Sequence, residues 1–403
     1  AHLTALDDVS GGDDALFNVT RLRRDFGAGS GAGLTYTDRS VRGGDDTNRV
    51  LAADVRHVFG RMYFLQAQYG HAWTRDESGE RDAAIWSLEL DRTGRLFGFN
   101  YKLGGVGEDF VSRTGYVPRT GYVEGQLFNR LAFYGAEGAL VEHINIVSIP
   151  RRIWRSDGFG KDDAIEGGES LSATFRLRGG WEVRAEGQRW FYELDPDAYA
   201  AYEVETENGL IPYQALDRVS GPGLSLRVET PAFRTFNASA SLGRAREPIF
   251  AEGAEGNVTE ASGSISLRPD PSVRLNVSTT FQEIRRTRDD SRFARTIIPR
   301  VRAEYQPTRA LFFRVIGEYQ SAREAALVDA RTGRPLLRDG TPVASKRTES
   351  LRLDLLASYE PAPGTVAYFG YGGTLFGEDT WNFREMRRAN DGFFLKLAYR
   401  WRR

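Results

Sequence analysis

Cysteine is absent from this chain of 403 residues. Its absence excludes a disulfide framework, a thiolate metal site and a cysteine nucleophile. Histidine is also rare, and His2, His57, His71 and His143 do not follow the spacing of metal ligands. We expect structural or lumen-facing roles for His57 and His71, and we expect no metal and no cofactor.

Long apolar runs are missing as well. A membrane-spanning helix needs about 18 consecutive, mostly apolar residues, and no stretch of this chain approaches that length. Insertion into a membrane by helices is thereby excluded. The lack of long apolar runs does not exclude a β-barrel, because barrel strands are apolar only at alternate positions.

The chain has no excess of charge of either sign, with 54 basic and 55 acidic residues. This balance argues against nucleic acid as a partner, since surfaces that bind nucleic acid are strongly basic. Lysine occurs only at Lys102, Lys161, Lys346 and Lys396, so nearly all basic residues are arginine. Genome composition is the simplest explanation of that bias.

Sequence motifs of known catalytic sites are also missing. No phosphate-binding loop, dinucleotide fingerprint or nucleophile elbow appears. Residues 193–221 combine carboxylates with aromatic residues, as sugar-cleaving sites do, and residues 153–166 hold carboxylates without the spacing of an EF-hand loop. We interpret both segments as surface loops and expect a non-enzymatic protein.

Alternation of apolar and polar residues is what the sequence does contain. Successive side chains of a strand point to opposite faces, so a period of two predicts a strand. In one segment Leu351, Leu353 and Leu355 alternate with Arg352 and Asp354. The same alternation occurs at residues 97–103, 171–178, 273–282 and 393–402.

The C-terminal segment shows this pattern most clearly. Leu395, Leu397, Tyr399 and Trp401 share one predicted face, and the opposite face carries lysine and arginine. A terminal strand with an apolar face that ends in aromatic residues resembles the closing strand of a bacterial outer-membrane β-barrel. Such strands usually stop at the aromatic residue, whereas two arginines follow Trp401 here. The alternative is an amphipathic strand of a soluble sandwich.

Short and long connections alternate between the predicted strands. The short ones carry turn residues such as Gly, Pro, Asp and Asn, and lie near 26–29, 59–61, 92–95, 135–138, 178–181, 231–235, 269–272, 306–309 and 360–364. The long ones are polar, and lie near 41–48, 74–82, 104–120, 153–166, 193–221, 246–257, 286–292, 324–347 and 377–391. A meander with tight turns at one end and long loops at the other is typical of outer-membrane barrels, whose long loops are extracellular.

Aromatic residues gather near both ends of the predicted strands, as they do where a barrel wall meets lipid headgroups. Those beside the short turns are Phe59, Trp181, Phe233, Phe236, Tyr305, Phe312, Tyr359 and Tyr368. Those nearer the long loops are Tyr69, Trp73, Tyr101, Trp190, Phe281 and Tyr319. The faces opposite the apolar ones are too highly charged for a dry core, and fit a water-filled lumen.

These patterns predict an all-β chain, folded as a transmembrane antiparallel up-and-down β-barrel of about 19–20 strands. The first complete strand is expected at 14–25 and the last at 391–402. Residues 1–8 are too short for a full strand of about nine to eleven residues, and are expected to be the tail of one. The whole chain, 1–403, is expected to be one barrel region. Because it begins at Ala1 without methionine, we expect a processed form or a fragment.

Two short motifs resemble a widespread bacterial family. They are residues 107–110 (Gly-Glu-Asp-Phe) and 115–122 (Gly-Tyr-Val-Pro-Arg-Thr-Gly-Tyr), and residues 21–27 and 36–39 resemble it too. Members of that family carry an N-terminal β-sandwich similar to carbohydrate-binding module family nine. A C-terminal region of unassigned function follows it, and is predicted to be an outer-membrane barrel. This chain resembles that C-terminal region.

The resemblance implies a location in the bacterial outer membrane, with lipid as a partner and polysaccharide as a further one. It also implies that this chain lacks the first strands of a full barrel. We therefore expect another polypeptide, or an N-terminal fragment of the same precursor, to complete the barrel.

The segment 104–120 is the loop for which we expect a function. It is glycine-rich, and Pro118 stiffens it beside Arg119. We favour a loop folded into the lumen as a constriction, with Arg119 anchored to an inward carboxylate; the alternative is a cap on the extracellular rim. Residues 193–221 and 324–347 are expected to be long extracellular loops. The candidate lumen residues are Asp109, Pro118, Arg119, Arg176, Arg184, Glu186, Arg227, Arg302, Glu304 and Arg314.

The function expected from the sequence is a channel, or the membrane scaffold of a larger envelope complex. The alternative is a secreted or surface-attached carbohydrate-binding or carbohydrate-active β-protein. An adhesion or structural module is a third class that the sequence does not separate from the scaffold.

Overall fold

The computed structural model describes residues 1–9, 13–41, 46–379 and 381–401. Within these ranges the chain consists almost entirely of antiparallel strands, joined by turns and two short 3₁₀ helices. The described residues contain no helix long and apolar enough to cross a membrane. Twenty of the described strands belong to long hairpins, and four short ones form a separate small sheet. The all-β prediction and the predicted strand number are confirmed.

The strands group into two compact units, which are described separately. Unit 1 comprises Ala1–Phe133 and Asn145–Ser172, and unit 2 comprises Tyr134–Ile144 and Ala173–Arg403. Strands β9 (Val141–Arg155) and β10 (Glu166–Leu177) contribute residues to both.

Unit 1 is an antiparallel meander in which each strand pairs with the next one along the chain. Its strands are β1 (His2–Val9), β2 (Asp13–Gly27), β3 (Ser30–Val41), β4 (Thr47–Phe59), β5 (Tyr63–Asp76), β6 (Gly79–Arg92), β7 (Phe97–Val106) and β8 (Tyr122–Tyr134).

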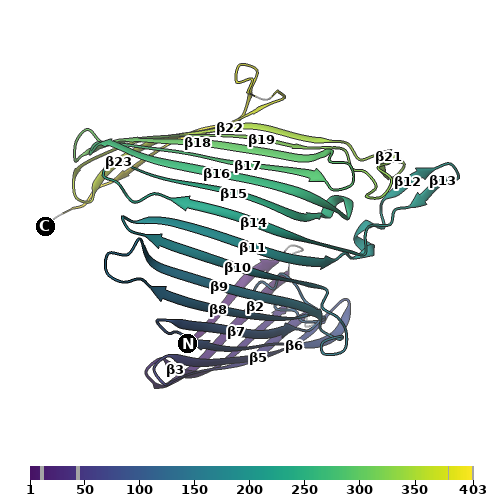
Figure 1. Cartoon of the computed structure of the whole chain (residues 1–403). Helices are drawn as coiled ribbons and strands as arrows, with labels where there is room; N and C mark the ends of the chain where they lie inside the picture. Colours follow the sequence, from purple (N-terminus) through teal and green to yellow (C-terminus); the bar gives the residue numbers. More distant parts are fainter. Residues whose placement is uncertain (10–12, 42–45, 380, 402–403) are drawn as a thin grey trace. The chain divides into compact units, whose positions relative to one another are not determined.

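Unit 2 contains a second antiparallel meander (Figure 1). Its strands are β11 (Trp181–Glu193), β14 (Arg218–Glu229), β15 (Phe236–Ile249), β16 (Ala254–Asp270), β17 (Val273–Arg286), β18 (Arg292–Tyr305), β19 (Leu311–Glu324), β22 (Lys346–Ala362), β23 (Thr365–Gly377) and β24 (Arg387–Ala398).

The predicted strict alternation of short and long connections was wrong, most clearly at two places, because the strands extend further than predicted. Residues 74–82 form no long loop: β5 and β6 remain paired up to Asp76 and Gly79, and only Glu77 and Ser78 lie between them. Gly79 has a φ of 107°, a conformation that suits glycine, and this permits the tight turn. Similarly, the predicted loop 246–257 is reduced to 250–253, which contains the 3₁₀ helix η2 (Phe250–Glu252).

The two terminal strands differ slightly from the prediction. Residues 2–9 form a strand of their own, β1, which pairs with β2 along its whole length. The last strand begins earlier than predicted, at Arg387, and ends at Ala398, where its partner β23 begins. Tyr399 and Trp401 therefore follow the strand. Arg402 lies outside the described residues.

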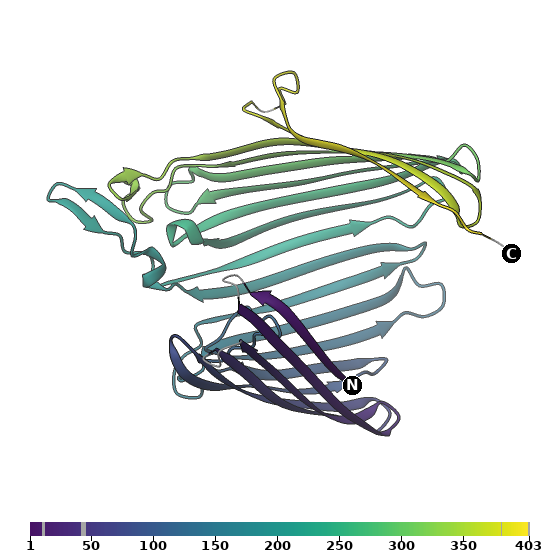
Figure 2. The same cartoon turned by 180° about the vertical axis from the view of Figure 1, so that it is seen from behind.

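Two of the long connections in unit 2 fold into a small assembly with its own core. Connection 194–217 holds the 3₁₀ helix η1 (Pro196–Tyr199) and the hairpin of β12 (Glu203–Thr206) and β13 (Gly209–Pro212), and connection 325–345 holds β20 (Leu336–Arg338) and β21 (Thr341–Pro342). These four short strands form one sheet, whose hairpin β12–β13 projects in Figures 1 and 2. Buried apolar side chains from both connections and from η2's flanks form the core: Leu194, Tyr199, Val204, Tyr213, Ile249, Leu327 and Leu336. We call this part the loop assembly.

Candidate functional site

Several long strands present one apolar and one polar face, among them β5, β14, β15, β18 and β22. In unit 2, Leu224 and Leu226 lie on one face of β14, and their neighbours across the pairing include Leu242 on β15. Leu224 and Leu242 are 69 % and 62 % exposed, so this face has no protein layer over it. In unit 1 the corresponding face of β5 carries Leu65, Tyr69 and Trp73, which are also exposed.

An exposed apolar face of this extent requires a non-aqueous environment. In lipid, backbone groups must be satisfied within the protein, which β-structure achieves by pairing its strands. An antiparallel meander with one apolar face and one charged face is the wall of a transmembrane β-barrel. The protein is an integral β-barrel protein of the bacterial outer membrane.

The opposite face of unit 2, which we call its polar face, carries arginine and carboxylate side chains in close pairs. Arg176 contacts Glu182 at 3.2 Å, Arg184 contacts Glu186 at 2.7 Å, and Arg227 contacts Glu229 at 2.6 Å. Farther along the meander, Arg300 contacts Glu318 at 3.3 Å and Arg352 contacts Asp354 at 3.2 Å. Most of these side chains are partly exposed, as expected for groups in contact with water.

Arg302, Glu304 and Arg314 lie together on this polar face. Arg302 pairs with Glu304 on its own strand, and Glu304 stands opposite Arg314 in the register between β18 and β19. The Nε of Arg314 is buried and has no hydrogen-bond partner among the described residues. Arg274 approaches Glu304 from β17 at 3.8 Å.

Connection 107–121 of unit 1 packs onto the polar face of its own unit. Phe110 is only 5 % exposed, and it packs with Ala72 and Val106 and against Val50 and Ile85. Ala72 alternates along β5 with the exposed Tyr69 and Trp73, and so lies on the polar face. The connection therefore crosses to this face and covers the ends of β4 to β7.

Polar contacts hold the same connection in place. The buried side chain of Asn48 donates to the carbonyl oxygen of Val111 and accepts from the backbone N–H of Arg113, both at 2.9 Å. The guanidinium of Arg113 contacts Asp46 at 2.8 Å and Asp76 at 2.7 Å. Two anchors of different chemistry, one apolar and one ionic, thus fix residues 110–113.

The residues of this connection singled out from sequence have lesser roles. Arg119 forms an ion pair with Glu166, and its guanidinium lies 5.5 Å from the ring centre of Tyr122. Pro118 and Asp109 are exposed. The motif did not reveal the side chains that fix this connection, and its role as a constriction stays a prediction. Phe110, Asn48 and Arg113 were missed as anchors, because Asn48 is distant in sequence and has no motif of its own.

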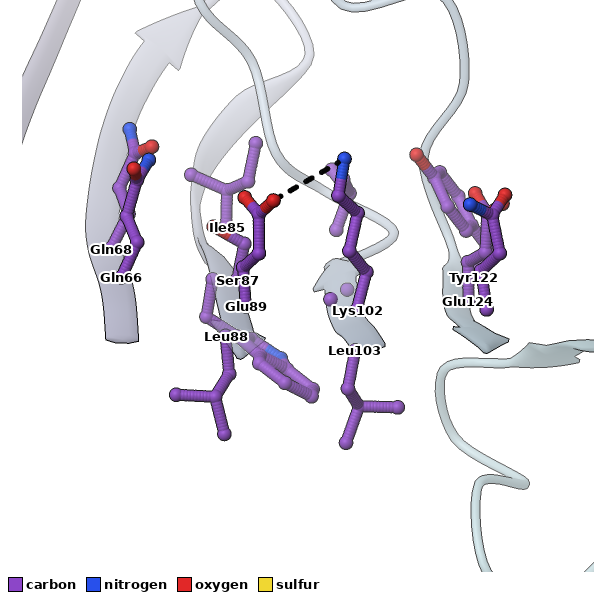
Figure 3. Close-up of a pocket in the computed structure, with 15 residues that line it drawn as sticks. Gln66, Gln68, Ile85, Ser87, Leu88, Glu89, Lys102, Leu103, Tyr122 and Glu124 are labelled. Atoms are coloured by element: carbon purple, nitrogen blue, oxygen red, sulfur yellow. Dashed lines mark ion pairs between the residues drawn. The ribbon is translucent and has the colours of Figure 1, made fainter. Parts of the chain in front are cut away.

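Beside the connection lies a pocket of about 370 Å³ on the polar face of β5 to β8 (Figure 3). Gln66, Gln68, Glu89, Lys102 and Glu124 point into it, while Leu88 and Leu103 point to the opposite side. Lys102 and Glu89 are 3.7 Å apart. The pocket thus offers amides, carboxylates and one ammonium group, which can form hydrogen bonds with a polar solute, beside apolar residues such as Ile85, Trp86 and Val106.

None of the four histidines lines this pocket. His71 contacts Asp82 at 2.9 Å, His2 contacts Thr20, His143 lies by the ring of Tyr134, and His57 stacks with Phe26 and Phe59. Over the described ranges, no three histidine or carboxylate side chains are grouped as metal ligands would be.

Comparison with known proteins gives only distant structural likenesses. No family model matches the sequence, and no curated protein is detectably similar to it. Among solved structures, OmpT, an outer membrane protein of Vibrio cholerae, has a TM-score of 0.39 at 10 % identity, covering 91 % of this chain and 98 % of that one. The copper transporter OprC has a TM-score of 0.46 at 12 % identity, with coverage of 98 % and 72 %.

The FrpB iron transporter from Neisseria meningitidis has a TM-score of 0.44 at 12 % identity, covering 97 % of this chain and 71 % of that one. At these TM-scores the strand faces, rather than the likenesses, carry the conclusion on the fold. The predicted kinship with proteins that bear an N-terminal carbohydrate-binding sandwich stays a prediction.

Proposed function

We propose that this chain is part of the wall of an outer-membrane channel for polar solutes, and that connection 107–121 forms its constriction. The role is non-enzymatic. The observation that carries the proposal is the position of Phe110, which the connection places on the polar face among Ala72, Val106 and Ile85. A loop that only capped the rim would have no reason to pack against strand residues of that face.

The charges of the polar face support passage of water and polar solutes. Arginine and carboxylate pairs recur on this face from Arg184 on β11 to Asp354 on β22. Paired charges of this kind are hydrated and fit an aqueous lumen, whereas in a dry core they would carry a large desolvation cost. The amide-lined pocket next to the constriction provides a place where a solute with several hydroxyl groups forms hydrogen bonds.

We further propose that another polypeptide, or a fragment of the same precursor, contributes strands to the wall. Among the described strands of its unit, β24 pairs with β23 alone, and it is exposed at each of its twelve residues, on both faces. In lipid, the N–H and C=O groups along the second edge of such a strand need partners from protein.

Single-channel conductance in planar bilayers tests the channel. The protein purified from outer membranes should conduct, and the double variant Phe110→Ala, Asn48→Ala should conduct more, because the constriction is released from the polar face. Tyr69→Ala, which removes an exposed ring from the apolar face of the same unit, is the matched control and should leave conductance unchanged. Absence of conductance in the folded wild-type protein would refute the channel.

A membrane scaffold of a larger envelope complex is the second candidate. The loop assembly favours the scaffold, since a channel rim alone does not require loops that fold around a buried core of their own. A folded protein that does not conduct, but that retains associated polypeptides on purification, would support the scaffold.

A further inference from the structure

The apolar face of unit 2 ends in two rows of arginine side chains toward the long connections. One row follows the strand pairing from Arg244 through Thr259 and Glu283 to Arg295, and continues to Arg323 and Arg347. The other row lies two residues nearer the long connections, and includes Arg189, Arg246 and Arg285. Together the two rows, which we call the arginine rows, consist of Arg189, Arg244, Arg246, Arg285, Arg295, Arg323 and Arg347.

The register places these arginines on the lipid-facing side. Arg244 stands opposite Leu224 across the β14–β15 pair, and it is two residues from Leu242 on its own strand. The next row toward the short turns is apolar, with Phe281 opposite Ile297. The arginine rows thus form the border of the apolar band.

Carboxylates on this border neutralise only part of the positive charge. Glu283 contacts Arg285 at 2.8 Å, Arg246 contacts Glu255 at 3.6 Å, and the buried Glu349 contacts Arg347 at 3.1 Å. Within the described part of the chain, Arg189, Arg244 and Arg295 are exposed and have no carboxylate partner.

The opposite border of the apolar band is different. Beside the short turns this face carries aromatic rings, with Tyr305 opposite Phe313 on the neighbouring strand and Tyr359 beyond. In unit 1, the comparable arginines are neutralised: Arg49 contacts Asp38 at 2.9 Å, and Arg75 pairs with Glu80. Arg189, Arg244 and Arg295 thus differ from Arg49 and Arg75 in having no carboxylate partner among the described residues.

We propose that the arginine rows bind the phosphate groups of lipopolysaccharide in the outer leaflet. The long connections of an outer-membrane barrel are extracellular, so this border lies at the depth of the outer-leaflet headgroups. Guanidinium groups form paired hydrogen bonds with phosphate oxygens. The acyl chains of the same lipid would cover Leu224, Leu242 and their neighbours. This inference rests on the membrane location, and not on the channel.

Binding of lipid A to the purified, detergent-solubilised protein tests the inference. The triple variant Arg189→Gln, Arg244→Gln, Arg295→Gln should bind lipid A added in detergent micelles more weakly, by about fivefold for each arginine removed. Wild-type binding should fall as salt is raised, because phosphate contacts are screened. Dephosphorylated lipid A in the same micelles should bind the wild-type protein no better than the triple variant binds lipid A.

A matched control removes the same charge from the polar face: Arg184→Gln, Arg227→Gln, Arg300→Gln. It should bind lipid A as the wild-type protein does. Gel migration before and after heating checks that each variant is folded. Equal lipid A binding by the wild-type protein and the folded triple variant would overturn the proposal, as would equal binding of phosphorylated and dephosphorylated lipid A. Neither result depends on conductance.

Discussion

Glu252 is a completely buried charged residue, with a side-chain exposure of 0 %. Its carboxylate contacts the guanidinium of Arg286 at 2.5 Å and accepts from the backbone N–H of Val328 at 2.9 Å. It thereby joins η2, β17 and connection 325–345 into one loop assembly. A buried ion pair is expensive to break, because the remaining partner is left charged and unpaired.

We predict that Glu252→Gln loosens the loop assembly by about 3–5 kcal/mol, because Arg286 keeps its charge in a buried site. Native-state proteolysis within residues 325–345 measures this local opening. Asp290→Asn removes a comparable but exposed pair with Arg285 (3.2 Å), and should cost less than about 1 kcal/mol. Equal cleavage rates for the two variants would contradict the prediction.

Tyr213 makes the stability of the loop assembly depend on pH in the alkaline range. Burial raises the pKa of Tyr213 from its ordinary value of 10 to about 12, and its hydroxyl donates to the carbonyl oxygen of Glu252. Burial also raises the pKa of Tyr199, whose hydroxyl donates to the carbonyl oxygen of Phe250. A raised pKa means that the stability contribution is complete below pH 10 and is lost as the pH rises toward about 12.

We therefore predict that the loop assembly opens between about pH 10 and 12, and that Tyr213→Phe reduces this alkaline step. At neutral pH the variant should lose only about 1 kcal/mol, the worth of one hydrogen bond. Proteolysis of the loop assembly as a function of pH provides the measurement. If the variant opened over the same alkaline pH range as the wild-type protein, groups other than Tyr213 would be responsible for the opening.

At the level of the element, connection 107–121 is fixed by Asn48 as much as by its own residues. We predict that Asn48→Ala raises the mobility of residues 110–113, since two partly buried hydrogen bonds to this segment are lost at about 1 kcal/mol each. Hydrogen exchange at the backbone N–H of Arg113 reports this directly. Arg119→Ala, which removes only a partly exposed ion pair with Glu166, should leave that exchange rate unchanged.

The sequence predicted the strands well, because a period of two is visible within each segment without knowledge of its neighbours. Segment 351–359 lies within β22 as expected. The ends of strands were less predictable: Arg75 and Glu80 are polar, yet they are paired residues of β5 and β6. From sequence alone, polar residues at the end of a strand are predicted as loop, because the partner strand that pairs with them is unknown.

The site was predicted in part, for a related reason. Arg184, Glu186 and Arg227 follow the strand alternation, so their common polar face could be inferred. The anchors of connection 107–121 could not be inferred from the sequence. Asn48 lies 63 residues from Val111, and only the folded meander brings them together. The loop assembly was missed for the same reason, as its core joins connections that are far apart in sequence.

At the scale of the whole molecule, the terminal strands make a prediction about composition. The protein extracted from outer membranes should carry a second polypeptide, or an upstream fragment of the same precursor, because β24 pairs with β23 alone among the described strands of its unit and lipid cannot satisfy its second edge. Native mass spectrometry in detergent detects it. A folded, membrane-extracted species with the mass of this chain alone would contradict this prediction, and would leave the lipid A and conductance tests unaffected.

The pairing of arginine with a carboxylate two residues away on the same strand has a consequence for biogenesis. Arg184 with Glu186, Arg227 with Glu229 and Arg352 with Asp354 each compensate one another within a single strand. Charge neutralisation within one strand does not require that a neighbouring strand has already been inserted. Strands β11, β14 and β22 can therefore enter the bilayer with these charges already paired, whatever the order in which the wall is assembled.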